Sequence, residues 1–292
     1  MSEAMPLPLS PLRPGTVVKM SDETYRTFQR FIYGLTGIHF QDSKKYLLEG
    51  RLGKRLQALN VPDFEAYYQM LKFGKGDELR FFYEVITINE TFFFRNEPQF
   101  EAFEKSLVPE TIGGGPRPVN RKLRVWSAAS SSGEEAYTLA MIYLERLKPR
   151  YPGLEIEIVG TDISQAVLET ARRGVYRDYS IRNMPKAYLD KYFTVQDSRY
   201  VVHDSVRSLV RFESLNLYDR QRMRLMANFD VIFCCNVLIY FDTASKIQVV
   251  SNLYDSLSRG GFLFIGYAES LHGISTAFKL LNFPKTVAYK KE

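Results

Sequence analysis

The stretch from Leu123 to Glu135 constrains the fold of this chain more than any other. It opens with a short apolar strand, Leu123–Trp126, continues through seven small residues, Ser127–Gly133, and ends in two glutamates before a helical pattern. A strand, a small-residue turn and a helix in this order form the ligand-binding crevice of a doubly wound α/β sheet. The small side chains would let a ligand approach the backbone closely.

The chemistry of the turn argues against a phosphate ligand. The run lacks the G-x-G-x-x-G pattern, and Glu134 and Glu135 stand where a phosphate group would lie. A phosphate site offers bare backbone amides, whereas two carboxylates suit a cationic ligand. S-adenosylmethionine carries an ammonium and a sulfonium and no phosphate, so it fits. Alternatively, both glutamates only stabilise the helix N-terminus, and the motif by itself leaves both interpretations open.

Cysteine and histidine usage predicts no metal site. The two cysteines, Cys234 and Cys235, are adjacent, which makes a poor structural disulfide. The three histidines are widely scattered in the chain. No apolar run reaches the roughly 20 residues that cross a bilayer, and the proline-rich residues 1–20 are predicted to be a disordered leader and not a signal peptide. These features favour a reducing cytoplasm without direct membrane insertion.

Hydrophobic spacing divides the chain into two predicted domains. Four short helices over residues 21–90 predict a small helical bundle, and residues 91–292 predict a Rossmann-like α/β sheet. An irregular segment at about 175–212 is predicted to be an antiparallel β insertion, with Leu209–Phe212 as one of its strands. Thr286–Tyr289 is predicted to close the sheet as an edge strand.

A basic face accompanies the second predicted helix, from about Asp42 to Leu59. Its members are Lys44, Arg51, Lys54 and Arg55. The pattern is typical of a solvated surface, and it equally suits a docking surface for an acidic helix or nucleic acid. The net charge of +6 and a pI of about 9.1 permit either acidic partner. No nucleic-acid-binding motif appears among the basic residues, so we expect no nucleic-acid partner.

Polar residues occur at three places where a ligand is expected. Ile88–Asn96 contains three consecutive phenylalanines flanked by polar side chains, and it forms either a core plug between domains or the wall of a ligand pocket. Asp162 ends the second strand of the sheet, where it can accept hydrogen bonds from ribose hydroxyls or cap the following helix. Asn236 ends the buried strand that begins at Phe229, and this places it at the ligand edge of the sheet.

Taken together, the motifs resemble the chemotaxis receptor methyltransferases of the CheR family over about Ser21 to Tyr289. The motifs that carry the resemblance are, in chain order, Asn89-Glu-Thr-Phe-Phe-Phe-Arg95, Trp126-Ser-Ala-Ala-Ser130, Gly133-Glu-Glu135, Gly160-Thr-Asp-Ile163, Leu215-Asn-Leu217, Asn236-Val-Leu-Ile-Tyr-Phe241 and Gly266-Tyr-Ala-Glu-Ser270. The resemblance implies a helical N-terminal domain, a methyltransferase sheet with a small β insertion, and S-adenosylmethionine-dependent methylation of receptor glutamates.

The resemblance also implies roles for particular residues. The implied cofactor contacts are Asn89, Thr91, Arg95, Glu134, Asp162, Asn216, Leu217, Asn236 and Val237. Arg95 and Tyr240 would act in catalysis, Arg95 either as a clamp on the cofactor carboxylate or as an aligner of the substrate carboxylate. The basic face would dock the cytoplasmic helical region of chemotaxis receptors. We expect a cytoplasmic monomer.

Two positions depart from the family pattern. Cys235 stands where the family usually has arginine, and Gln57 replaces one arginine of the basic helix. The first departure removes a charge near the expected pocket. It keeps a different class of function open, namely a signalling adaptor that retains the fold and the cofactor without efficient turnover. A methyltransferase acting on another substrate is the second alternative.

Overall fold

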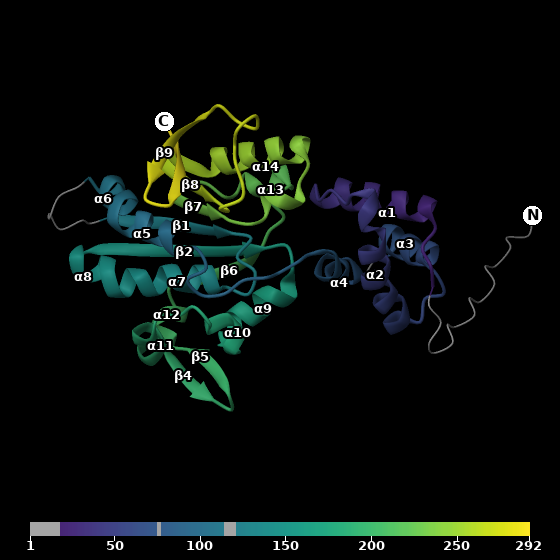
Figure 1. The fold of residues 1–292 in the computed structure, drawn as a ribbon, viewed down its shortest axis with the longest axis horizontal. Coiled ribbons are helices and arrows are strands. Elements are labelled where there is room, and N and C mark those ends of the chain that lie inside the picture. The colour runs from purple at the N-terminus through teal and green to yellow at the C-terminus, as the bar shows by residue number, and fades with distance from the viewer. Residues whose placement is uncertain (1–17, 75–76, 114–120) are drawn as a thin grey trace, which may run out of the picture. The chain divides into compact units, whose positions relative to one another are not determined.

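The computed structural model describes residues 18–74, 77–113 and 121–292, with only the backbone described at Arg121 (Figure 1). Residues 1–17 of the expected leader therefore lie outside the described part. The chain divides into two compact units, Met1–Thr87 and Ile88–Glu292. The sequence placed the division at residue 90.

The first unit is a small helical bundle. Ser21 caps the first helix, since its side chain accepts a hydrogen bond from Thr24 N, and Gly37 ends that helix in the left-handed conformation. The aromatic rings of Phe28, Tyr67 and Phe82 pack together in its core, with centroids 6.2–6.4 Å apart. The elements are α1 (Asp22–Thr36), the 3₁₀ turn η1 (Asp42–Lys44), α2 (Lys45–Leu59), α3 (Phe64–Phe73) and α4 (Glu78–Ile86).

The second unit is built on a seven-stranded sheet with the order β6-β2-β1-β7-β8-β10-β9 (Figure 1). The first five strands run parallel, and β10 pairs antiparallel with both β8 and β9. From β1 the chain continues outward through β2 and β6, and it then returns to add β7 on the other side of β1. The strands are β1 (Arg121–Ala128), β2 (Leu154–Asp162), β6 (Val210–Ser214), β7 (Phe229–Cys234), β8 (Leu257–Ile265), β9 (Phe278–Phe283) and β10 (Thr286–Lys291).

This strand order creates a topological switch point between β1 and β7. Ligands of open α/β sheets bind at the carboxyl ends of the strands at such a point. The buried run Phe229–Cys234 forms the central strand that its continuous apolar pattern predicted. The sequence-based expectation of a Rossmann-like sheet with a small antiparallel insertion is confirmed.

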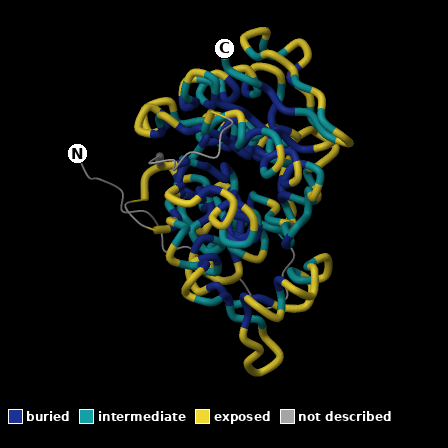
Figure 2. Tube along the Cα trace, turned by 90° about the vertical axis from the view of Figure 1, so that its left-hand side faces the viewer, coloured by how far each residue is buried: buried dark blue, intermediate teal, exposed yellow. Residues whose placement is uncertain are grey.

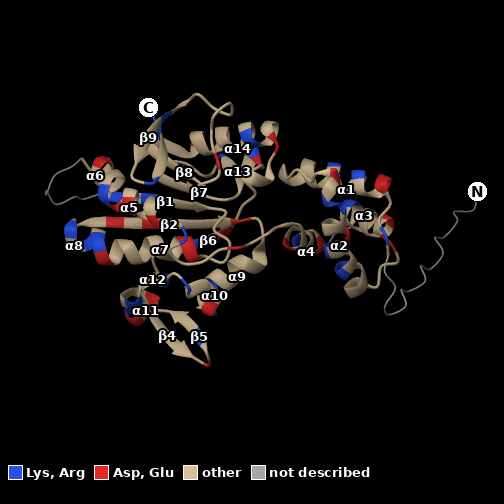
Figure 3. Cartoon of the chain, viewed as in Figure 1, with Lys and Arg blue, Asp and Glu red and all other residues tan. Residues whose placement is uncertain are grey.

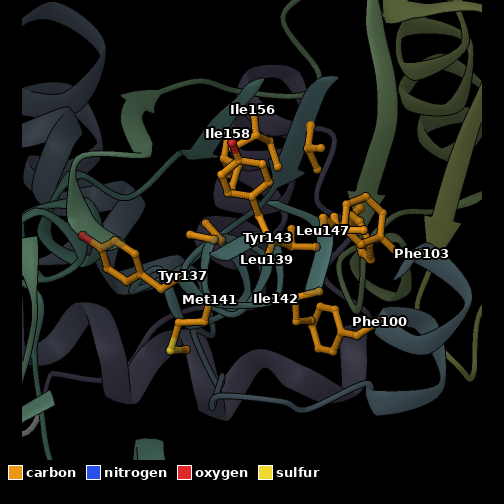
Figure 4. Close-up of a cluster of buried hydrophobic side chains, with 14 of the residues drawn as sticks. Phe100, Phe103, Tyr137, Leu139, Met141, Ile142, Tyr143, Leu147, Ile156 and Ile158 are labelled. Atoms are coloured by element: carbon orange, nitrogen blue, oxygen red, sulfur yellow. The ribbon is translucent and has the colours of Figure 1, made fainter. Parts of the chain in front are cut away.

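Helices and turns complete the second unit. The sheet packs against an apolar cluster in which Phe100, Phe103, Leu139 and Ile158 lie close together (Figure 4), and the burial of each residue can be followed along the trace in Figure 2. No helix in the described ranges has the length and apolarity to span a bilayer. The elements are α5 (Glu97–Ala102), the π-helical η2 (Phe103–Leu107), α6 (Val108–Thr111), α7 (Glu134–Ile142), the π-helical η3 (Tyr143–Leu147), α8 (Lys148–Arg150), α9 (Gln165–Arg173), α10 (Asp178–Ile181), α11 (Lys186–Tyr192), α12 (Asp204–Arg207), α13 (Arg220–Met223), the 3₁₀ turn η4 (Leu238–Tyr240) and α14 (Thr243–Ser256).

The β insertion is a three-stranded antiparallel sheet in the order β3-β5-β4. A two-residue turn joins β4 to β5, and both turn residues, Asp197 and Ser198, have positive φ. This backbone matches the twist of a tight hairpin. The strands are β3 (Val175–Tyr176), β4 (Phe193–Gln196) and β5 (Arg199–Val202).

Two strand predictions were wrong. Leu209–Phe212 was expected in the insertion, but Val210–Ser214 pairs parallel with β2 in the main sheet. Thr286–Tyr289 was expected at the edge, but β10 lies between β8 and β9. The sequence analysis missed β9, Phe278–Phe283, because lysine and asparagine interrupt its apolar pattern. The position of each strand depends on which strand it pairs with. The local sequence pattern does not contain that information.

Candidate functional site

The turn after β1 is held tightly at the carboxyl edge of the sheet. The N–H of Ser130 donates to the carbonyl of Thr161 on β2, over 2.7 Å. Gly133 ends the turn with a φ of +94°, and a Cβ placed there would meet Ala171 Cβ and Phe212 Cζ at 2.8 Å. A larger residue would therefore clash as well as strain the backbone. The small residues of the turn thus let it pack closely against neighbouring elements.

Asp162 ties this turn to the start of α9. Its carboxylate accepts hydrogen bonds from Ser131 N over 3.0 Å and from Ser164 N over 2.9 Å. Burial raises the pKa of Asp162 to about 6, although these N–H donors oppose the shift. The contact with Ser164 fixes the N-cap residue of α9, and Asp162 does not itself cap the N–H groups of the helix. A carboxylate has about four acceptor positions, so the bonds leave capacity for ribose hydroxyls.

The two adjacent glutamates of α7 lie in different surroundings. The Glu134 carboxylate is buried and accepts a hydrogen bond from Ser132 Oγ over 2.7 Å. It lies near Tyr176 and Arg182, which belong to the segment around the insertion, and burial raises its pKa. Glu135 accepts a hydrogen bond from Ser127 Oγ, also over 2.7 Å, at the carboxyl end of β1. Glu135 therefore contacts the end of β1, whereas Glu134 contacts the turn that follows it.

Glu135 is only partly compensated by neighbouring groups. It is partly exposed, yet the surrounding protein desolvates it enough to raise its pKa to about 7. The Ser127 hydroxyl, the Cys235 thiol and the positive charge of Arg95 lower that pKa without cancelling the effect of desolvation. A cationic ligand would provide the missing compensation. The arrangement therefore fits the ammonium group of S-adenosylmethionine.

Cys235 occupies the position just beyond β7 and is held from α5. Its Sγ donates to Gln99 Oε1 over 3.2 Å, while Gln99 Nε2 donates to the carbonyl of Ile265 over 2.6 Å. Burial raises the pKa of the Cys235 thiol well above its usual value, so the thiol is protonated and poorly reactive. Gln99 thus bridges the ends of β7 and β8.

Two of the three phenylalanines, Phe93 and Phe94, anchor the Asn89–Arg95 segment. Phe93 is fully buried against Tyr176 and Phe193, with ring centroids 4.9 and 5.3 Å away. Phe94 takes a positive φ of 58°, and its N–H donates to Thr138 Oγ1 on α7 over 3.3 Å. The segment is thus anchored within the second unit through its aromatic rings.

The Asn89–Arg95 segment contacts the turn after β1 through the backbone of Asn89. The carbonyl of Asn89 accepts a hydrogen bond from Ser131 Oγ over 3.3 Å. Arg95 Nη1 donates to the carbonyl of Glu90 over 2.6 Å, and the charge of Arg95 lowers the pKa of Glu135. Arg95 and Glu135 therefore lie within electrostatic range of each other. Thr91 is partly exposed in the same segment.

The remaining predicted residues follow the carboxyl ends of β6 and β7. Asn216 and Leu217 come just after β6, and the side chain of Asn216 accepts a hydrogen bond from Tyr218 N over 3.0 Å. Asn236, Val237 and Tyr240 form the turn after β7, and Asn236 has a positive φ of 62°. The fold thus brings the predicted segments after β1, β2, β6 and β7 to the carboxyl edge of one sheet, and Glu134 remains a predicted contact.

The predicted docking residues belong to the first unit, whose lysine and arginine positions are coloured blue along the ribbon in Figure 3. Arg55 forms a two-pronged ion pair with Glu78, with both N–O distances at 2.6 Å. Arg51 Nη1 donates to the carbonyls of Val85 and Ile86 over 3.4 and 3.2 Å. The two arginines therefore hold α2 against α4, whereas Lys44 and Lys54 are exposed.

Sequence reasoning did not single out Ser127 or Gln99, and it considered both glutamates for a cationic ligand but assigned the cofactor contact to Glu134. Successive helical residues point about 100° apart, so the orientation of α7 decides which glutamate faces the switch point. The serine at the end of β1 was a usable signal, because a polar tip on a central strand lies at the ligand edge. No group of three or more candidate metal ligands occurs in the described ranges.

Comparison with known proteins identifies the family. The model for the CheR methyltransferase all-alpha domain matches residues 23–87, and that for the CheR methyltransferase S-adenosylmethionine-binding domain matches residues 89–287. Chemotaxis protein methyltransferase 2 of Vibrio cholerae is 35% identical over 276 residues, which cover 94% of each chain. Chemotaxis protein methyltransferase of Vibrio parahaemolyticus is 36% identical over 280 residues, covering 94% of this chain and 99% of that one. The chain therefore belongs to the CheR methyltransferase family, with S-adenosylmethionine as its cofactor and methyl transfer in chemotaxis as its function.

Proposed function

We propose that this protein methylates glutamate side chains on the cytoplasmic helical region of chemotaxis receptors, forming glutamate methyl esters. The observation that supports the proposal is a desolvated carboxylate, Glu135, which bonds to Ser127 at the carboxyl end of β1 and lies within electrostatic range of the Arg95 guanidinium. A carboxylate and a guanidinium at separate points of one site complement the ammonium and carboxylate groups of an amino acid. The methionine end of S-adenosylmethionine carries both groups, so the site would orient the cofactor by this end.

The rest of the edge would hold the nucleoside. Asp162 would accept hydrogen bonds from the ribose hydroxyls at the end of β2, and the missing Cβ at Gly133 lets the turn pack against Ala171 and Phe212. The cofactor supplies a methyl group on a sulfonium. The further proposed contacts are Asn89, Thr91, Asn216, Leu217, Asn236 and Val237.

The chemical step needs alignment more than proton transfer. A glutamate side chain has a pKa near 4.3 and is ionised at neutral pH, so no general base is required. A carboxylate oxygen of the substrate forms a bond to the methyl carbon while the carbon–sulfur bond breaks, which leaves a neutral thioether. The protein would hold the carboxylate in line and exclude water from it. Tyr240, in the turn after β7, would orient the substrate carboxylate.

The deciding experiment measures label transfer from methyl-labelled S-adenosylmethionine. We expect base-labile label in receptor cytoplasmic fragments, lost when their methylation-site glutamates become alanine. Label in another substrate class, or in no substrate, would contradict the proposal. Cofactor binding measured by calorimetry without any turnover would instead support an adaptor that keeps the cofactor.

Replacing Arg95 with alanine is expected to raise the KM for S-adenosylmethionine by roughly ten- to hundredfold, since a hydrogen bond to a charged group contributes about 1.5–3 kcal/mol. The kcat at saturating cofactor should change little if Arg95 is the clamp. Steady-state kinetics with both substrates varied provide the measurement.

Arg182 offers a matched control, because its guanidinium lies 3.5 Å from the ring centroid of Phe92, in the same aromatic segment. Arg182→Ala should leave the KM for the cofactor close to the wild-type value. A large loss of kcat in Arg95→Ala with an unchanged cofactor KM would assign Arg95 to the substrate carboxylate instead.

Receptor docking is best tested at Lys44 and Lys54, because both are exposed. Charge reversal of both lysines to glutamate should raise the KM for receptor at low salt and leave cofactor affinity unchanged. The difference should shrink as salt rises, since screening acts within about 8 Å at physiological ionic strength. Reversing Lys148 and Lys285, exposed lysines of the second unit, changes the net charge equally. An equal effect from this control pair would refute a docking role for the basic face.

A further inference from the structure

The turn that follows β7 is held by a carboxylate from a distant part of the chain. Glu269 lies in the loop after β8, and its Oε2 accepts hydrogen bonds from Asn236 N over 3.1 Å and Gly266 N over 2.5 Å. Its Oε1 accepts from Ile239 N over 3.1 Å. One side chain therefore binds the backbone of two separate loops. If Glu269 only shaped the loop after β8, the bond to Gly266 would be sufficient. The bonds to Asn236 and Ile239 reach the turn after β7 instead.

The loop held in this way is strained and is built at close quarters. Asn236 takes a positive φ of 62°, an uncommon conformation for a residue with a Cβ. A Cβ at Gly266 would lie 2.7 Å from Asn236 N and 2.7 Å from Glu269 Oε2. Only glycine therefore lets the two loops approach closely enough for the carboxylate to reach both. The backbone bonds to Glu269 offset the strain at Asn236.

The two strand ends have a second connection through α5. Gln99 joins the thiol of Cys235 to the carbonyl of Ile265. Gln99 and Glu269 thus fix Cys235 and Asn236, which are consecutive in the chain, to the end of β8. The turn that carries Asn236, Val237 and Tyr240 is held from two directions.

We propose that Glu269 is a positioning residue for methyl transfer, which sets the turn from Cys235 to Phe241 in the geometry that binds the cofactor and presents Tyr240. The proposal rests on the proposed contacts of that turn. Glutamate suits the task because its two oxygens accept bonds from three N–H groups. In glutamine, an NH₂ group would replace one of the two oxygens and would face a backbone N–H. Two donors cannot bond to each other, so the two loops would separate.

The test compares Glu269→Gln with Asp230→Asn. Asp230 lies near the start of β7, at the opposite end of that strand from the turn. Its buried carboxylate accepts a hydrogen bond from Arg124 N on β1 over 2.9 Å. Both changes remove a carboxylate that binds backbone N–H groups of a neighbouring segment, so both should lower the melting temperature. Only Glu269→Gln should also weaken the binding of S-adenosylhomocysteine, by about tenfold, the equivalent of one charged hydrogen bond.

A second variant perturbs the same contact without changing charge. Gly266→Ala should push the loops apart and weaken S-adenosylhomocysteine binding in the same direction, with a lower kcat because Tyr240 moves with the turn. Calorimetry gives the affinity, and differential scanning measures the loss of stability. Wild-type affinity in Glu269→Gln and Gly266→Ala, or an equal loss of affinity in Asp230→Asn, would overturn the proposal.

This measurement is independent of the receptor substrate. Wild-type protein that binds S-adenosylhomocysteine but methylates no receptor fragment would refute the proposed substrate. The affinity of Glu269→Gln would still decide the role of Glu269.

Discussion

Replacing Glu135 with glutamine is expected to weaken the binding of S-adenosylhomocysteine by roughly ten- to hundredfold, because a hydrogen bond between charged partners contributes about 1.5–3 kcal/mol. The glutamine keeps the shape of the side chain and can still accept a hydrogen bond from Ser127. It loses the negative charge that would meet the ligand ammonium. Isothermal titration calorimetry at neutral pH provides the measurement.

The adjacent glutamate is the matched control. Glu134→Gln changes the same residue type one position earlier on α7, where the carboxylate bonds to Ser132. Its affinity for S-adenosylhomocysteine should stay near that of the wild type. The reverse result, with a loss in Glu134→Gln only, would support the sequence-based assignment of Glu134 as the cofactor contact.

The pH dependence of binding gives an independent check. The pKa of Glu135 is raised to about 7 in the unliganded protein, so the carboxyl must lose a proton before it can pair with the ligand ammonium. Affinity should therefore rise from about pH 6 to about pH 8, and Glu135→Gln should flatten most of this rise. Asp162, with a pKa raised to about 6, adds a smaller contribution at the acidic end.

Stability of the unliganded protein should change in the opposite direction. A carboxyl whose pKa is raised on folding favours the folded state below its unfolded pKa, near 4.5 for glutamate. That contribution is lost as the pH rises through about 7. The melting temperature of the unliganded wild type should consequently fall over this range more steeply than that of Glu135→Gln.

Replacing Arg55 with alanine is expected to destabilise the helical bundle by about 3 kcal/mol, the lower end of the range for breaking a buried ion pair. The lower end applies because the Arg55 side chain is 19% exposed. Its loss leaves the Glu78 carboxylate, only 9% exposed, with the Tyr67 hydroxyl as a hydrogen-bond donor over 2.7 Å. It also removes the guanidinium 4.2 Å from the Phe81 ring centroid.

Two spectroscopic signals separate the units in a urea titration. Far-UV circular dichroism reports the helices, whereas the single tryptophan, Trp126, lies buried in β1 and reports the second unit. Arg55→Ala should shift a part of the dichroism transition and leave the Trp126 fluorescence midpoint in place. Lys54→Ala, an exposed neighbour on α2, should change neither signal. Equal stability losses in the two variants would show that the Arg55–Glu78 pair contributes nothing specific.

This ion pair also changes how docking should be tested. The sequence grouped Arg51 and Arg55 with Lys44 and Lys54, because all four are basic and close along one helix. The structure gives the two arginines partners on or at the end of α4. Reversing their charge would therefore damage the bundle before it tested any receptor contact.

The sequence by itself determined the fold class and the location of the site. Alternating strand and helix patterns define a parallel sheet, and the carboxyl ends of such strands meet at one edge. The small residues of Ser127–Gly133 and the polar ends at Asp162 and Asn236 therefore predicted one ligand site. These signals are readable because they depend on residue type and on spacing along the chain.

Only the tertiary structure decided which side chains face that site and what holds it together. The direction of α7 places Glu135 against Ser127 and Glu134 against Ser132, and a helical pattern does not record how a helix is rotated against its sheet. The Glu269 contacts with Asn236 and Ile239 join residues about thirty positions apart, and pairing of β6 with β2 likewise joins distant segments. Contacts of this kind arise when separate elements pack, because packing selects one arrangement from several that the local sequence permits.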